Sequence, residues 1–320
     1  MKKIILGFPK QFKIGSQSAK KTSVTGNFNK LLICGMGGSA LPGDILRMLA
    51  KDFKVNFPVY IHRTYNLPYW VNKKCLIVCI SYSGNTEETL SAFKEACRRN
   101  FQVTAVTSGG RLAKLCRNNK VPLAKVPLGY PPRMALGFQF SALMQILVNC
   151  QMIKDNLKTI LSLERRLKPE QLEKKGKNLA SKIKDKIPLI YSSYSQKELS
   201  RIWKIKLNES SKVLAFSNYF PELNHNEITG FENPQGKSHV IILRDPANHP
   251  RNKKRMRLTA TILKKKKIPV DFVDIQGKDI LYKIFSNLLL ADWVSYYLAL
   301  EYGINPIPVK LQEEFKKKLK

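Results

Sequence analysis

The stretch Ile80-Ser81-Tyr82-Ser83-Gly84-Asn85-Thr86-Glu87-Glu88-Thr89 places a glycine and the hydroxyls of Ser81, Ser83 and Thr86 where a strand turns into a helix. The apolar run before it predicts a buried strand, and the apolar residues after it recur at helical spacing. Such a turn offers backbone N–H groups and the positive end of a helix dipole, which together favour an anion. The alternative interpretation is an ordinary helix cap, with Thr86 at the N-cap and Glu88 or Thr89 supporting it.

Strands alternate with helices around this stretch. The pattern predicts a parallel sheet covered on both faces by helices, with ligands at the carboxyl ends of the strands. The predicted strands are 31–34, 55–61, 75–80, 103–107 and 121–126.

The same alternation restarts near residue 188, where a strand is followed by the turn Ser192-Ser193-Tyr194-Ser195 and a helix. This repetition indicates a duplicated fold. We expect an N-terminal domain over 1–152 and a C-terminal domain over 153–320. Residues 151–185 are expected to form a linker helix, residues 308–319 a closing helix, and residues 1–30 a short helix or an extended arm.

The chain carries 56 Lys and Arg residues against 23 Asp and Glu, a net charge of +33. This charge favours anionic partners, either phosphorylated metabolites or nucleic acid. The basic residues are spread along the chain, and no helix-turn-helix, zinc finger or RNA-binding aromatic motif accompanies them. We therefore expect no specific binding to nucleic acid.

Targeting and redox signals are absent from the sequence. No apolar run reaches the roughly 18–20 residues that span a bilayer, and the apolar start is too short for a signal peptide. The six cysteines lie in apolar patterns without CxxC spacing, and the four histidines do not join them at zinc spacing. We expect a cytoplasmic protein with structural thiols, no metal and no membrane association.

A second turn, Gly35-Met36-Gly37-Gly38-Ser39, follows the first predicted strand. Its spacing is not the G-x-G-x-x-G of dinucleotide-binding folds, and it lacks the Gly-Lys-Ser/Thr of a P-loop. What it offers is close approach of the backbone to a ligand, with a hydroxyl beside it. The alternative is a tight strand-to-helix turn without a ligand.

Several motifs now carry a resemblance. Four stretches resemble those of sugar isomerase (SIS) domains. They are the turns at residues 35–39 and 81–89, Thr107-Ser108-Gly109-Gly110 and Pro132-Arg133-Met134-Ala135-Leu136-Gly137. With Asn208-Glu209 and Glu222-Leu223-Asn224-His225-Asn226-Glu227 added, the chain resembles the bifunctional phosphoglucose/phosphomannose isomerases over about residues 31 to 310. The resemblance implies two SIS-type, doubly wound parallel-sheet (flavodoxin-like) αβα domains.

The resemblance also implies an activity. It is the interconversion of glucose 6-phosphate, and of mannose 6-phosphate, with fructose 6-phosphate by a cis-enediol mechanism, without cofactor or metal. Such a reaction belongs to glycolysis and gluconeogenesis. Two alternatives stay open: an SIS isomerase for another sugar phosphate, and a regulator that binds a sugar phosphate without turnover.

The resemblance assigns roles to particular residues. The phosphate-binding residues are Gly38, Ser39, Ser81, Ser83 and Thr86. The catalytic residues are Glu209 as the base, His225 for ring opening, Arg133 for the enediolate and Lys316 as an assistant in ring opening. Lys310 is a rival to Lys316, because the run of lysines near the C-terminus leaves the register open.

Three further expectations complete the sequence-based prediction. His225 is contributed by the neighbouring subunit, which implies a homodimer. The family's Asp-Pro-Thr-Pro is Asn305-Pro306-Ile307-Pro308 here, which leaves the balance between glucose and mannose 6-phosphate undetermined. Glu222 and Glu227, which flank His225, are expected to be orienting residues and not bases.

Overall fold

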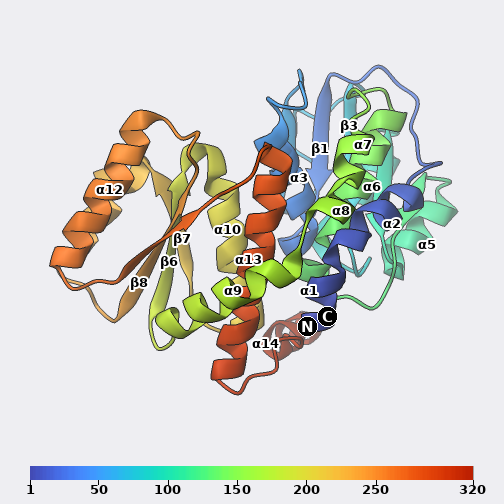
Figure 1. The fold of residues 1–320 in the computed structure, drawn as a ribbon. Coiled ribbons are helices and arrows are strands. Elements are labelled where there is room, and N and C mark those ends of the chain that lie inside the picture. Colours follow the sequence, from blue (N-terminus) through green and yellow to red (C-terminus); the bar gives the residue numbers. More distant parts are fainter. Residues whose placement is uncertain (320) are drawn as a thin grey trace. The chain divides into compact units, whose positions relative to one another are not determined.

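The computed structural model describes residues 1–319, which divide into two compact units (Figure 1). The N-terminal unit is Gly7–Leu167. The C-terminal unit consists of Met1–Leu6 together with the chain from Lys168 onward. The sequence-based division follows residue 152, whereas the division in the structure follows Leu167, so the two short helices α7 (Leu157–Leu161) and α8 (Leu163–Arg166) belong to the first unit.

The N-terminal unit holds a five-stranded sheet in the order β2-β1-β3-β4-β5, and all its pairings are parallel. This is the flavodoxin-like, doubly wound order, so the predicted fold class is confirmed. The strands are β1 (Lys30–Cys34), β2 (Val59–His62), β3 (Cys75–Ile80), β4 (Val103–Thr107) and β5 (Leu123–Lys125).

The central strand β3 is buried along its whole length, as expected of a parallel strand covered on both faces. β2 begins only after Pro58, because proline cannot donate to a strand ladder. The accompanying helices are α2 (Gln11–Ser18), α3 (Leu41–Leu49), α4 (Glu87–Arg98), α5 (Gly110–Asn118) and α6 (Leu136–Asn149).

The C-terminal unit holds a four-stranded parallel sheet in the order β7-β6-β8-β9. Its strands are β6 (Ile187–Ser193), β7 (Phe216–Phe220), β8 (Ser238–Arg244) and β9 (Val270–Asp274). Its helices are α1 (Lys2–Gly7), α9 (Pro169–Ile183), α10 (Lys197–Lys206), α11 (Glu227–Gly230), α12 (Pro250–Lys265), α13 (Ile280–Glu301) and α14 (Lys310–Lys318). The sequence did not predict β7, an edge strand whose side chains are mostly half-buried or exposed.

The predicted linker helix over 151–185 is wrong. The structure has three helices there, α7, α8 and α9, and the last break falls just before Pro169. A proline disfavours helical geometry in the residue that precedes it, and its own fixed φ suits the first turn of a new helix. Lys168 accordingly leaves the helical region at φ −124° and ψ 79°, and Pro169 opens α9.

Residues near the N-terminus are helical and not extended, with α1, a short 3₁₀ turn and α2 spanning residues 2–18. Within residues 1–319 no helix is long and apolar enough to cross a membrane. All six cysteines are free thiols, and every one except Cys97 is buried. Burial raises the pKa of the Cys116 thiol to about 12, which keeps it protonated at neutral pH.

Candidate active site

Three turns meet at the carboxyl edge of the N-terminal sheet. The Tyr82 N–H, just after β3, donates to Ser39 Oγ in the turn after β1 at 3.0 Å. The Tyr82 carbonyl accepts from Ser108 Oγ, in the turn after β4, at 2.7 Å. The turn at residues 35–39 (the glycine turn) and the loop at residues 81–89 (the serine loop) therefore lie side by side, as expected where parallel strands end together.

The serine loop is organised by its own hydroxyl groups. Ser81 Oγ donates to Thr86 Oγ1 at 2.9 Å and accepts from the Gly84 N–H at 3.1 Å. Thr86 is the N-cap residue of α4, but its side chain makes no capping hydrogen bond. The prediction of an N-cap is therefore right in position only, and the start of the helix lacks the side-chain acceptor that a cap would supply.

Charge and exposure differ along this loop. Ser81 is fully buried, whereas Ser83 is exposed and Thr86 is half-buried. The exposed carboxylate of Glu87 in the first turn of α4 accepts a hydrogen bond from the Tyr65 hydroxyl at 3.3 Å. Neutral hydroxyls at a helix start can hold a phosphate through hydrogen bonds, without a metal.

Two glycines are required by close packing. Gly84 adopts φ +68°, and a Cβ on it would lie 1.8 Å from the Gly109 carbonyl oxygen. A Cβ on Gly38 would lie 2.9 Å from the backbone nitrogen of Arg133. Only glycine allows these loops to approach one another so closely.

Arg133 is not a surface residue. It lies in the 3₁₀ turn η3 (Pro132–Met134) that leads into α6, and its exposed fraction is 1%. Its backbone packs against Gly38, so the structure gathers all six predicted residues of this unit at one edge. They are Gly38, Ser39, Ser81, Ser83, Thr86 and Arg133.

In the C-terminal unit, Glu209 lies in a π-helical turn, η5 (Leu207–Ser211), that extends α10. Such turns are rare and occur frequently at functional sites. The side chain of Lys212, at φ +58°, donates to the carbonyls of Glu209 at 2.6 Å and Ser210 at 3.3 Å. Glu209 is half-buried, and this lysine holds its main-chain carbonyl group in place.

A buried ion pair underlies the same turn. Lys206 Nζ lies 2.6 Å from Asp292 Oδ1 of α13, and both side chains are at most 1% exposed. Ser211 Oγ also donates to the Ser295 carbonyl of α13 at 2.8 Å. Sequence reasoning missed this pair, although a signal exists: Asp292 is a lone carboxylate within an apolar run, and buried charges require partners.

His225 ends the 3₁₀ turn η6 (Glu222–His225) and is exposed, while Leu223 anchors the turn in the core. The Asn226 amide donates to Glu222 Oε1 at 2.8 Å. Glu227 accepts hydrogen bonds from Tyr191 and Asn218. Both glutamates are thus engaged in holding the loop, while Glu209 and His225 lie on separate elements.

The predicted C-terminal lysines, Lys316 and Lys310, both lie on α14, which buries none of its residues. The structure therefore does not choose between them. Among residues 1–319, no cluster of three or more His, Cys, Asp or Glu side chains is arranged to hold a metal ion.

Comparison with known proteins decides the family. A bifunctional phosphoglucose/phosphomannose isomerase from Caldicellulosiruptor bescii is 36% identical over 331 aligned residues, which cover 98% of this chain and 97% of the relative. The chain belongs to this isomerase family. A family member from Aquifex aeolicus is 35% identical, with coverage of 99% of this chain and 98% of the relative.

Two further matches agree with this membership. Residues 172–319 match the family model described as the bacterial phospho-glucose isomerase C-terminal SIS domain. Among solved structures, the C-terminal domain of glucosamine-fructose-6-phosphate aminotransferase from Francisella tularensis superposes with a TM-score of 0.69 at 14% identity. That match covers 96% of this chain and 97% of the other, and it shows a shared fold.

Proposed function

We propose that this chain is an aldose–ketose isomerase that interconverts glucose 6-phosphate and mannose 6-phosphate with fructose 6-phosphate. The observation that supports it most is the serine loop. The Ser81 and Thr86 hydroxyls are bonded to each other at the start of α4, where the side chain of the N-cap residue makes no capping hydrogen bond. Membership of the phosphoglucose/phosphomannose isomerase family supplies the class of substrate.

The phosphate is assigned to the N-terminal unit. Ser81, Ser83 and Thr86 would donate hydrogen bonds to its oxygens, with Ser39 beside them. Gly38 would contribute a close backbone. Binding of this kind positions the sugar but leaves the proton transfer to other groups, because hydroxyl and amide groups do not ionise near neutral pH.

The proton transfer is assigned to Glu209. Its carboxylate would take the proton from C2 of the open-chain aldose while the C1 carbonyl oxygen gains a proton, which gives a cis-enediol. Return of the proton to C1, with loss of the proton from the C2 hydroxyl, gives the ketose, so no atom is gained or lost overall. General acid–base catalysis of this kind contributes about 10²–10⁴-fold in rate.

Three basic residues complete the proposed reaction. His225 would open the ring by moving a proton between the C1 hydroxyl and the ring oxygen, with Lys316 or Lys310 assisting. Arg133 would stabilise the negative charge that develops on the enediolate oxygen, since a guanidinium stays charged at any working pH.

We further propose that the protein is a cytoplasmic homodimer acting in glycolysis and gluconeogenesis, with His225 supplied across the interface. One feature supports association. Leu311 and Phe315 on α14, and Leu319 directly after its end, follow one another at four-residue spacing, with exposed fractions of 81%, 62% and 55%. Apolar side chains on one helix face favour burial against a second surface.

A coupled assay tests the proposed function. Purified protein in EDTA is offered glucose 6-phosphate and mannose 6-phosphate separately, and fructose 6-phosphate is measured. We expect formation from both. If neither sugar yields fructose 6-phosphate, the proposed isomerase activity is rejected. Tight binding without product would favour a sugar-phosphate-binding regulator, and turnover of a different sugar phosphate would favour another SIS isomerase.

A further inference from the structure

The two sheets share one plan, which allows their turns to be matched. In the orders β2-β1-β3-β4 and β7-β6-β8-β9, β6 takes the place of β1 and β8 that of β3. β1 and β6 are each followed by a one-turn 3₁₀ helix, η2 (Gly37–Ser39) and η4 (Tyr194–Gln196). The residue directly after β3 is Ser81, and the residue directly after β8 is Asp245.

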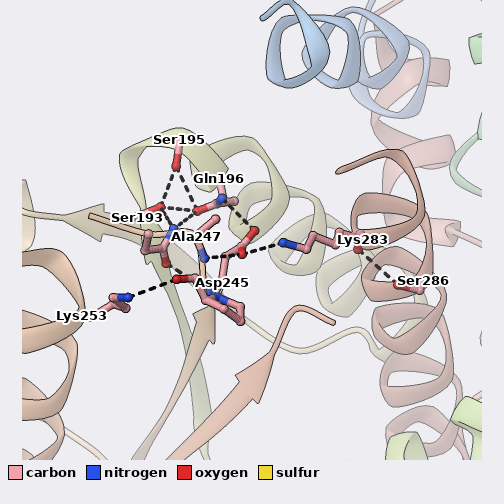
Figure 2. Close-up of polar contacts among 10 residues, drawn as sticks. Ser193, Ser195, Gln196, Asp245, Ala247, Lys253, Lys283 and Ser286 are labelled. Atoms are coloured by element: carbon pink, nitrogen blue, oxygen red, sulfur yellow. Dashed lines mark hydrogen bonds and ion pairs between the residues drawn. The ribbon is translucent and has the colours of Figure 1, made fainter. Parts of the chain in front are cut away.

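Asp245 is a buried carboxylate held by three donors (Figure 2). Its Oδ1 accepts from Lys283 Nζ at 2.8 Å and from the Ala247 N–H at 2.9 Å. Its Oδ2 accepts from the Gln196 side chain at 3.4 Å. An ammonium, a backbone N–H and an amide together form the kind of donor set that binds a phosphate oxygen.

The hydroxyls of the matching turn already have hydrogen-bond partners within the turn. Figure 2 shows the contact between Ser193 Oγ and Ser195 Oγ, which are 2.9 Å apart. The Asn248 amide donates to Ser193 Oγ at 3.0 Å. The Asn248 amide also donates to Gln196 Oε1 at 2.8 Å. The turn therefore has the polar groups of a phosphate loop, but they are bonded to one another and to Asp245.

The surroundings of this turn are positively charged. A pocket of about 330 Å³ next to it is lined by Arg244, Lys253 and Arg257, together with Pro246, Asp274 and Gln276. Asp274 is paired with Arg244 at 2.6 Å. A second anion would be attracted to this edge, but it would meet the Asp245 carboxylate where the N-terminal loop has a serine.

We propose that this turn is a second copy of the phosphate site, occupied by the chain's own Asp245 carboxylate. The inference rests on the proposed role of the Ser81 loop. It implies that the native chain binds one phosphate fewer than its two repeats could hold, and that Asp245→Ser opens an additional anion site in which Lys283 is the cationic partner.

Equilibrium dialysis with inorganic phosphate tests this inference. Asp245→Ser should bind one more phosphate per chain than the wild type at millimolar concentration. Asp274→Ser, which removes another paired carboxylate at the same edge of the sheet, is the matched control and should gain nothing. Asp245→Ser combined with Lys283→Met should lose the gain. An unchanged count in folded Asp245→Ser, or an equal gain in Asp274→Ser, would overturn the proposal.

The difference between variant and wild type is the readout, so it survives if the Ser81 loop binds no phosphate, since both proteins then lack the same site. Asp245→Ala also empties the place of the carboxylate and covers the case in which Asp245→Ser does not fold. Phosphate should raise the melting temperature of Asp245→Ala more than that of the wild type or of Asp274→Ala. Equal shifts of the melting temperature in the three proteins would contradict the proposal that the Asp245 carboxylate occupies a phosphate site.

Discussion

At the scale of single residues, the C-terminal unit separates two tasks that a glutamate can have. Glu227 is bonded by Tyr191 and Asn218, and burial, with the Glu227 carboxylate beside it, raises the pKa of Tyr191. Glu209 instead lies half-buried on a π turn whose backbone is held by Lys212. A base must exchange its proton with substrate, so Glu209 suits that role better than the loop-holding glutamates.

Glu209→Gln should abolish turnover while sugar phosphate still binds. The amide has nearly the same shape but cannot accept the C2 proton, so we expect kcat to fall by about 10²-fold or more. The measurement is kcat in the coupled assay, with binding followed by equilibrium dialysis. Glu222→Gln is the control and should keep most activity. Near-full activity in Glu209→Gln would show that the base is another residue.

Lys206→Met should destabilise the protein by about 3–5 kcal/mol, because it leaves the Asp292 carboxylate buried without its cation. Lys206→Met with Asp292→Leu should recover most of this loss. The side chain of Lys182 is 57% exposed and pairs with Asp271, so Lys182→Met should lower the free energy of unfolding by no more than about 1 kcal/mol. Urea unfolding measures all three, and similar losses for Lys206→Met and Lys182→Met would contradict this account.

At the scale of elements, the loops that meet at the sheet edge depend on backbone geometry as much as on side chains. Gly84→Ala should therefore weaken phosphate binding and raise KM for sugar phosphate. The positive φ of residue 84 costs any residue other than glycine about 1–2 kcal/mol, and the new Cβ would overlap the Gly109 carbonyl oxygen.

Gly230→Ala is the control for this loop prediction, because a Cβ there meets nothing within 4 Å. Steady-state kinetics of both variants give the comparison. An unchanged KM in Gly84→Ala would show that the loop can rearrange without harm to phosphate binding.

Local patterns made most elements predictable. The buried strand 75–80 and the serine loop are encoded by adjacent residues, so periodicity and turn chemistry identify them. β7 could not be found this way, because an edge strand with half-exposed side chains lacks a clear period. The single linker helix is wrong because Pro169 starts a new helix, although the apolar residues before it recur at helical spacing.

The site was less accessible to sequence reasoning. The family resemblance named Glu209 and His225, and the structure places both in the C-terminal unit, on η5 and η6. Lys206 and Asp292 are 86 positions apart (292 − 206). Their pairing depends on tertiary packing that no local pattern reports. The same is true of Lys283 and Asp245.

At the scale of the whole molecule, the N-terminal helix α1 is tied to the C-terminal unit. Lys2 Nζ lies 2.6 Å from Glu173 Oε1 of α9 and 5.8 Å from the centre of the Trp293 ring of α13. Glu173 also accepts from the Tyr297 hydroxyl. The hydrogen bond from Lys2, followed by that from Tyr297, lowers the pKa of Glu173 below its ordinary value of 4.5.

A lowered carboxyl pKa contributes stability that is complete above the pKa of the unfolded chain and is lost as the pH falls through the folded value. Glu173→Gln should therefore be less stable than the wild type at pH 7, and the difference should shrink below about pH 4.5. Melting temperatures across pH 3–7 measure it. Glu170→Gln is the control on the same helix, and a gap that does not narrow in acid would contradict the assignment.

The tie between α1 and the C-terminal unit also has a consequence for synthesis. Residues 2–6 leave the ribosome before the whole N-terminal unit, yet their partners Glu173 and Trp293 are made much later. The first unit can fold as soon as it has emerged, since domains generally fold in that order. Residues 2–6 can dock only when synthesis of the C-terminal unit is nearly complete, so their docking is among the last folding events of the nascent chain.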